Sequence, residues 1–222
     1  MNRKIWCIRV SADPAFARLD RNYQDPVGVS CAECGGVASP QRQPLVVEWE
    51  DNSSKIGDFV FAGADIVLQD RVAQQLRQVS DSFRTIEVTF FDHPNLRKPK
   101  NCSKRKLNSR IWLPYEGPAL SQLLPMLHVP LAEGSSVEVD FICNACGRIQ
   151  YKRLWGVEEK TLGNSVPRVE GKGLFVSSAD LSGADFFSPI GLNLVLCTNS
   201  MKEYFDSKRF SNVDLLEYGD VV

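Results

Sequence analysis

The sequence predicts an α+β fold in which mixed sheets carry only a few short helices. Many apolar segments are short and alternate with polar residues, as strands do, whereas few segments show helical spacing. Two matching CxxCG tetrads, at 31–35 and 143–147, connect parts of the chain that are far apart. We therefore expect the sheets to be stapled by a four-cysteine, zinc-ribbon-like site.

Strands are predicted where apolar residues alternate with polar ones or form short runs. They are 4–10, 45–49, 59–61, 66–68, 85–90, 137–141 and 192–196. Asp70 can cap a helix over 71–79, and a short helix is expected over 120–127. Residues 11–30 are predicted to be a loop, and the glycine-rich stretch 156–173 a flexible linker.

The C-terminal segment repeats the order strand, helix, strand that is predicted for 58–90. Its helix carries Met201, Tyr204 and Phe205, and the strand after it begins near Phe210, which is 127 positions after Phe83. This recurrence is compatible with two related strand-helix-strand units. The tetrads are 112 positions apart, so no single offset in residue number aligns the whole first part of the chain with the second.

Length and composition allow one domain over 1–222 or two tightly packed halves, about 1–92 and 107–222, joined by a basic loop. With 43% hydrophobic and 24% charged residues, the 222-residue chain has an ordinary globular composition. Its formal net charge of −1 argues against a general binder of polyanions. We expect partners to be recognised by local features.

Cys31, Cys34, Cys143 and Cys146 are the predicted metal ligands. Two residues between paired cysteines let both sulfurs reach one ion, and the glycine that follows permits a left-handed turn. Four thiolates are the ligand set of structural Zn²⁺. A disulfide pair, a CxxC redox centre and two unrelated buried pairs stay open as alternatives.

The tetrads and the tail resemble the double-CxxCG immunity proteins, a family of myxobacterial paralogues. The matching residues are Cys31, Cys34, Gly35, Cys143, Cys146, Gly147, Leu174, Phe175, Asp185 and Phe186. The best-known members protect swarming cells against a toxin that sibling cells deliver. The resemblance implies an immunity protein that binds and neutralises a cognate toxin, encoded beside it, with zinc holding the fold.

A basic run between the halves offers a second interpretation, a zinc-ribbon module that binds nucleic acid or associates with transcription. Its cations are Arg97, Lys98, Lys100, Lys104, Arg105 and Lys106. The run contains no aromatic residue for stacking on bases, so nucleic acid is the less favoured partner and a solvated loop the simpler interpretation. Among these cations, Cys102 is the one cysteine with a setting that favours reactivity.

No catalytic motif is evident, and we expect the protein not to be an enzyme, because four cysteines leave zinc no open position for water. His93 and His128 are expected to have packing or surface roles, and Cys7 and Cys197 to be inert core thiols. No apolar run is long enough to span a bilayer, and the first residues lack a secretory signal. A cytoplasmic protein without membrane contact is expected.

Overall fold

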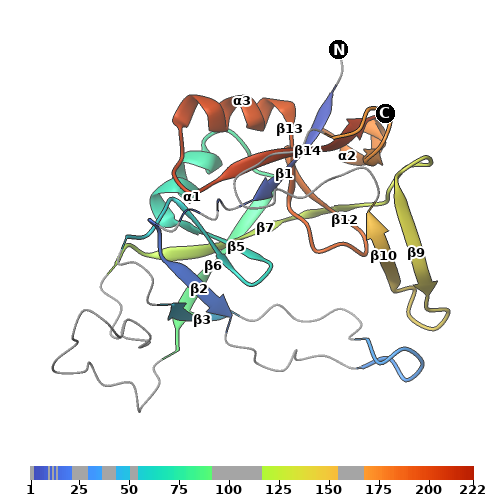
Figure 1. Ribbon diagram of the computed structural model, residues 1–222, viewed down its shortest axis with the longest axis horizontal. Coiled ribbons are helices and arrows are strands. Elements are labelled where there is room, and N and C mark those ends of the chain that lie inside the picture. The colour runs from blue at the N-terminus through green and yellow to red at the C-terminus, as the bar shows by residue number, and fades with distance from the viewer. Residues whose placement is uncertain are drawn as a thin grey trace.

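The computed structural model describes residues 3–9, 11, 13, 15–21, 30–36, 44–50, 55–91, 117–154 and 168–222. This part of the chain is mostly strand, with three short helices (Figure 1). In chain order the elements are β1 (Lys4–Arg9), β2 (Arg18–Arg21), β3 (Leu45–Glu50), β4 (Phe59–Ala62), β5 (Asp65–Gln69), α1 (Asp70–Arg77), β6 (Phe83–Phe90), β7 (Leu120–Pro125), β8 (Leu127–Val129), β9 (Val137–Ile142), β10 (Ile149–Leu154), β11 (Leu174–Val176), α2 (Ser178–Leu181), β12 (Phe186–Pro189), β13 (Leu196–Thr198), α3 (Asn199–Lys208) and β14 (Asp214–Val221). The predicted fold class is confirmed.

Six strands close into a barrel in the order β2-β3-β6-β7-β5-β4. The sheet is mixed, because β3 runs parallel to β6 and β2 parallel to β4, while the other neighbours are antiparallel. Five of these strands precede residue 91, whereas β7 comes from beyond residue 116. β7 lies between β5 and β6 and pairs with both.

A second mixed sheet has the order β11-β14-β1-β13-β12-β8. All its strands come from the C-terminal part of the chain except β1, which pairs with β13 on one side and β14 on the other. A separate hairpin, β9 and β10, carries the second tetrad at its turn. Each half therefore contributes one strand to the sheet of the other.

The two longer helices pack on a shared apolar cluster. Val72, Ala73 and Leu76 of α1 are buried, as are Met201 and Phe205 of α3. Both predicted strand-helix-strand units are present, as β5-α1-β6 and β13-α3-β14. None of the described helices has the length and apolar character needed to cross a membrane.

The helix predicted over 120–127 is wrong, because Leu120–Pro125 forms strand β7. Every side chain of β7 is buried, so both the inner and the outer face of this barrel strand are covered. Such a strand does not alternate, so periodicity cannot distinguish it from a buried helix. Its polar residues are satisfied: Ser121 donates a hydrogen bond to Asp70 (2.5 Å) and Gln122 to Asp65 (2.8 Å).

Two further predictions require correction. The loop predicted over 11–30 contains β2, a four-residue strand whose Leu19 is buried. The strand predicted over 192–196 begins only at Leu196, where β13 starts. Residues 156–167 of the predicted linker lie outside the described residues, as does the predicted boundary between the halves.

Gly219 allows the last strand to approach β11 closely. It pairs with Leu174, and a Cβ atom on Gly219 would lie 1.6 Å from the Leu174 carbonyl oxygen. Backbone cannot move aside as a flexible side chain can. The contact between β11 and β14 therefore requires glycine.

We predict that Gly219→Ala destabilises the protein by about 1–3 kcal/mol or more, because the added methyl separates the two strands. Val222→Ala, three positions further on and largely exposed, is the control and should change stability by less than about 0.5 kcal/mol. Denaturant unfolding of both variants measures the effect. Equal stability of the two variants would contradict the close approach.

A charged network connects the end of β14 to the rest of the second sheet. Lys4 contacts the Glu217 carboxylate at 2.6 Å, and Arg168, whose side chain is only 7% exposed, contacts Glu217 at 3.0 Å and Asp220 at 2.7 Å. Partial burial raises the pKa of Glu217, but hydrogen bonds and charge from Lys4 and Arg168 outweigh burial and lower it overall.

Because the pKa of Glu217 is lower in the folded state, its ionisation stabilises the protein above the unfolded-state pKa, about 4.3. This contribution is lost as pH falls through the lower folded-state pKa. We predict that Glu217→Gln is less stable than the wild type at pH 7 and that the difference shrinks below about pH 4. Denaturant unfolding from pH 7 to pH 3 tests this, and a difference independent of pH would contradict it.

Candidate metal site

The two tetrads form backbone knuckles with the same hydrogen bonds. The Cys31 amide donates to the Gly36 carbonyl (2.7 Å) and the Gly35 amide to the Cys31 carbonyl (2.9 Å). In the second knuckle the Cys143 amide donates to the Arg148 carbonyl (2.9 Å) and the Gly147 amide to the Cys143 carbonyl (2.8 Å). The CxxCG sequence thus specifies one local structure twice.

The glycines of the tetrads are required by backbone conformation. Gly35 has φ of 64° and Gly147 of 69°, in the left-handed region. A Cβ atom at either position would have no neighbour within 4 Å, so space is not the constraint. The turn that glycine permits closes each knuckle.

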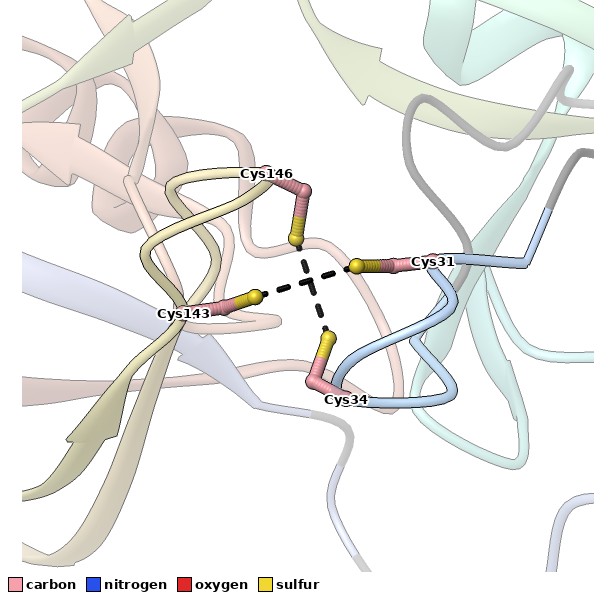
Figure 2. Close-up of side chains that lie close together, drawn as sticks. All are labelled: Cys31, Cys34, Cys143 and Cys146. Carbon is pink, nitrogen blue, oxygen red and sulfur yellow. Dashed lines mark hydrogen bonds between the residues drawn. The ribbon is translucent and has the colours of Figure 1, made fainter.

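The structure brings all four predicted ligands together, with every pair of sulfurs within 4.8 Å. Figure 2 shows the four side chains pointing at a common centre, two from each knuckle. The sulfurs of Cys31 and Cys143 are 3.7 Å apart, as are those of Cys34 and Cys146. A tetrahedron of thiolates about 2.3 Å from a zinc ion has edges of about 3.8 Å. The arrangement therefore fits a tetrahedral metal ion.

The sulfur positions also decide between the alternatives. The 3.7 Å separations are far longer than a disulfide bond of about 2.05 Å, and all four cysteines are free thiols. Two unrelated pairs are contradicted by the single cluster, and a redox centre of one CxxC would not need the second. One four-sulfur site remains.

The thiols differ in acidity although they share one site. Hydrogen bonds from the Cys34 and Glu33 backbone amides lower the pKa of Cys31 to about 7. The Arg148 backbone amide lowers the pKa of Cys146, but the neighbouring thiols of Cys143, Cys31 and Cys34, together with desolvation, raise it overall to about 12. Four thiols this close cannot all ionise unless a cation offsets their mutual repulsion. A divalent metal supplies that cation and releases the protons.

Two charged side chains lie at the knuckles, and no motif in the sequence marks either of them. The Cys143 thiol lies 3.9 Å from the Glu33 carboxylate, toward which it donates. The Arg148 side chain lies against Gly36 of the other knuckle, where a Cβ atom would be 2.2 Å from the guanidinium. The only signal for Arg148 is its place directly after the second tetrad, and many surface arginines have similar neighbours.

The remaining candidates lie away from this site or outside the described residues. His128 is an exposed residue of β8 and does not belong to the four-sulfur cluster. Cys7 and Cys197 are buried, and burial, with the neighbouring Cys7 and Asp185, raises the pKa of Cys197 well above its usual value, so it stays a neutral thiol. His93, Cys102 and the predicted partner contacts at 97–106 fall outside the described residues.

Comparisons with known proteins assign neither a family nor a function to the chain. No protein-family model matches the chain, and a search of curated proteins found no match. The resemblance to the double-CxxCG immunity proteins therefore stays a prediction from the residues named above. What the structure itself shows is a four-cysteine cluster with the geometry of a metal site.

Proposed function

We propose that the protein holds one structural Zn²⁺ ion through Cys31, Cys34, Cys143 and Cys146. The observation that carries this proposal is the four-sulfur cluster, whose 3.7 Å separations suit tetrahedral coordination. Thiolates favour soft or borderline metals, and zinc commonly occupies Cys₄ sites in proteins. With four protein ligands the ion has no position for water or substrate, so its role is structural and not catalytic.

We further propose that the protein is a cytoplasmic immunity protein that neutralises a cognate toxin by binding it. The support is the resemblance of the two tetrads and the tail, from Leu174 to Phe186, to the double-CxxCG family. A structural metal site leaves function to the protein surface. Neutralisation would then depend on shape and charge complementarity over an interface of about 1,200–2,000 Å² in total.

The metal proposal predicts one zinc ion per chain in protein purified without added metal. Cys31→Ser should reduce this to a small fraction, because a hydroxyl is a poor replacement for a thiolate ligand. The neighbouring Ser30→Ala, an exposed position outside the ligand set, should keep its zinc. Elemental analysis with a protein assay measures the ratio. Equal zinc contents in Cys31→Ser and Ser30→Ala would contradict the ligand assignment.

The immunity proposal predicts a stoichiometric complex with the toxin encoded by the adjacent gene. Co-purification followed by size-exclusion chromatography measures the complex, and an unrelated toxin serves as control. Failure to bind the adjacent product would contradict the immunity role and leave the metal site unaffected. Nucleic-acid binding at low salt, falling steeply as salt rises, would instead favour the module that uses the basic run at 97–106.

A further inference from the structure

The element order of the first half recurs through the second. From β1 to β6 the chain runs through two strands, the CxxCG knuckle and four further strands, with one helix before the last of them. From β7 to β14 the same order recurs, with the second knuckle carried on the hairpin β9-β10 and with α2 added. The recurrence therefore includes the knuckles as well as the strand-helix-strand units. We call residues 3–91 the first copy and 117–222 the second copy.

Strand pairing recurs as well. Beginning from β2, the barrel has the order β2-β4-β5-β7-β6-β3, and the second sheet has the order β8-β12-β13-β1-β14-β11. Along these orders the first and last pairs are parallel in both sheets, and the three pairs between them are antiparallel. The barrel has one further, antiparallel pair, between β2 and β3, which closes it and which the second sheet does not have. In this correspondence β7 takes the place of β1. The two copies have therefore exchanged their first strands.

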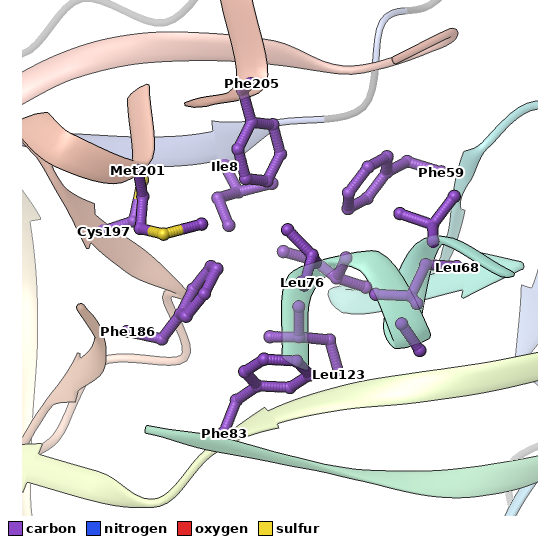
Figure 3. Close-up of a cluster of buried hydrophobic side chains, with 13 residues drawn as sticks. Ile8, Phe59, Leu68, Leu76, Phe83, Leu123, Phe186, Cys197, Met201 and Phe205 are labelled. Carbon is purple, nitrogen blue, oxygen red and sulfur yellow. The ribbon is translucent and has the colours of Figure 1, made fainter. Parts of the chain in front are cut away.

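Buried side chains follow the same correspondence. Leu45 and Val47 fill the barrel, and Leu174 and Val176, each 129 positions later, fill the second sheet's core. A third cluster lies between the copies and takes members from both, which face one another in Figure 3. Three pairs of residues in this cluster are each separated by 129 positions in the sequence: Leu68 and Cys197, Val72 and Met201, and Leu76 and Phe205.

Equivalent serines make equivalent contacts across the two copies. The Ser82 hydroxyl accepts hydrogen bonds from the Asp185 and Phe186 amides (3.1 and 2.8 Å). Ser211, 129 positions after Ser82, accepts one from the Asp58 amide (2.9 Å). Each bond connects one copy to the other. The copies are thus joined by two exchanged strands, a shared core and reciprocal hydrogen bonds, none of which involves the cysteine site.

Among the described residues, the first knuckle contacts mainly the second. None of residues 30–36 belongs to the three buried clusters of the described part of the chain, and neither do residues 138–152. The side-chain contacts seen between the first knuckle and other described residues are those of Cys31, Cys34, Glu33 and Gly36, and all lead to 143–148. The hairpin has a further contact, since Tyr151 and Ile149 lie against Gly191, in the turn that follows β12.

We infer that the chain is two copies of one unit, interlocked by their exchanged first strands, and that the metal is a clasp between their knuckles. It holds residues 30–36 against 143–148. The two sheets do not depend on it. Removal of the metal therefore releases the first knuckle while β1, β5, β7 and β13 keep their pairing. This inference rests on the proposed metal site.

Hydrogen exchange measured by mass spectrometry on the full chain tests the clasp. Zinc-loaded protein is compared with protein treated with a zinc chelator under a phosphine reductant, which keeps the thiols reduced. The double variant Cys31→Ser, Cys34→Ser provides metal-free protein without a chelator, and Ser30→Ala is the matched control. Metal content is determined in every sample.

We expect amides of 30–36 and of the 143–148 turn to lose protection when metal is removed, and to regain it when zinc is returned. Amides of β1, β5, β7 and β13 should keep their protection throughout. Simultaneous loss in these strands would overturn the inference, because the metal would then hold the fold. Persistent protection of 30–36 without metal would overturn it too. Protein purified without any metal would overturn the proposed zinc site itself, which the metal assay distinguishes from the other results.

Discussion

Four cysteine sulfurs within 4.8 Å of one another impose the constraint on which the candidate site depends. Thiolates at this distance repel one another. Backbone hydrogen bonds lower the pKa of Cys31 to about 7, whereas the neighbouring thiols and desolvation outweigh the Arg148 amide and raise that of Cys146 to about 12. A divalent cation converts the repulsion into coordination. Each knuckle closes through a left-handed glycine at which a Cβ atom would meet no neighbour, so backbone conformation is the constraint there.

The constraint also connects the two halves of the chain at a symmetric position. Cys31 pairs with Cys143 and Cys34 with Cys146, each 112 positions apart and each at 3.7 Å, so corresponding ligands face one another. The same correspondence relates the strands, the buried residues and the reciprocal serine contacts. A two-fold relation of this kind is the arrangement expected where two equal units bury the same surface against each other. In this protein one chain supplies both units.

Local chemistry made the site predictable from sequence. Each CxxCG segment contains, within five residues, two ligands and the turn that orients them. A structural zinc ion needs four ligands, so a shared ion implies that 31–35 and 143–147 meet. The alternating strand 137–141 and the helix near Asp70 were predictable for the same reason, because their patterns are local. The predicted cap was wrong, since Gln69 is the N-cap residue and Asp70 is the first residue of α1. Strand β7 was not, since burial on both faces removes the alternation that identifies a strand.

The exchange of strands could not be predicted from the sequence. Insertions of different length place equivalent residues at different separations: 112 positions for the knuckle cysteines, 127 for Asp58 and Asp185, and 129 for Ser82 and Ser211. No single offset therefore exposes the repeat, and the pairing of Phe83 with Phe210 at 127 does not fit the serine correspondence. Nor does any local pattern in Lys4–Arg9 indicate that β1 pairs with strands that begin at Leu196 and Asp214. Pairing over such separations is decided by which apolar surfaces can be buried together. That information is spread over the whole chain.

X-ray absorption spectroscopy at the zinc edge of the purified protein reports the number, type and distance of the ligand atoms. If the two knuckles meet on one zinc ion, the spectrum should show four sulfur ligands at about 2.3 Å and no lighter ligand. Oxygen or nitrogen ligands in the first coordination sphere, or fewer than four sulfurs, would contradict the conclusion that the two knuckles meet on one ion.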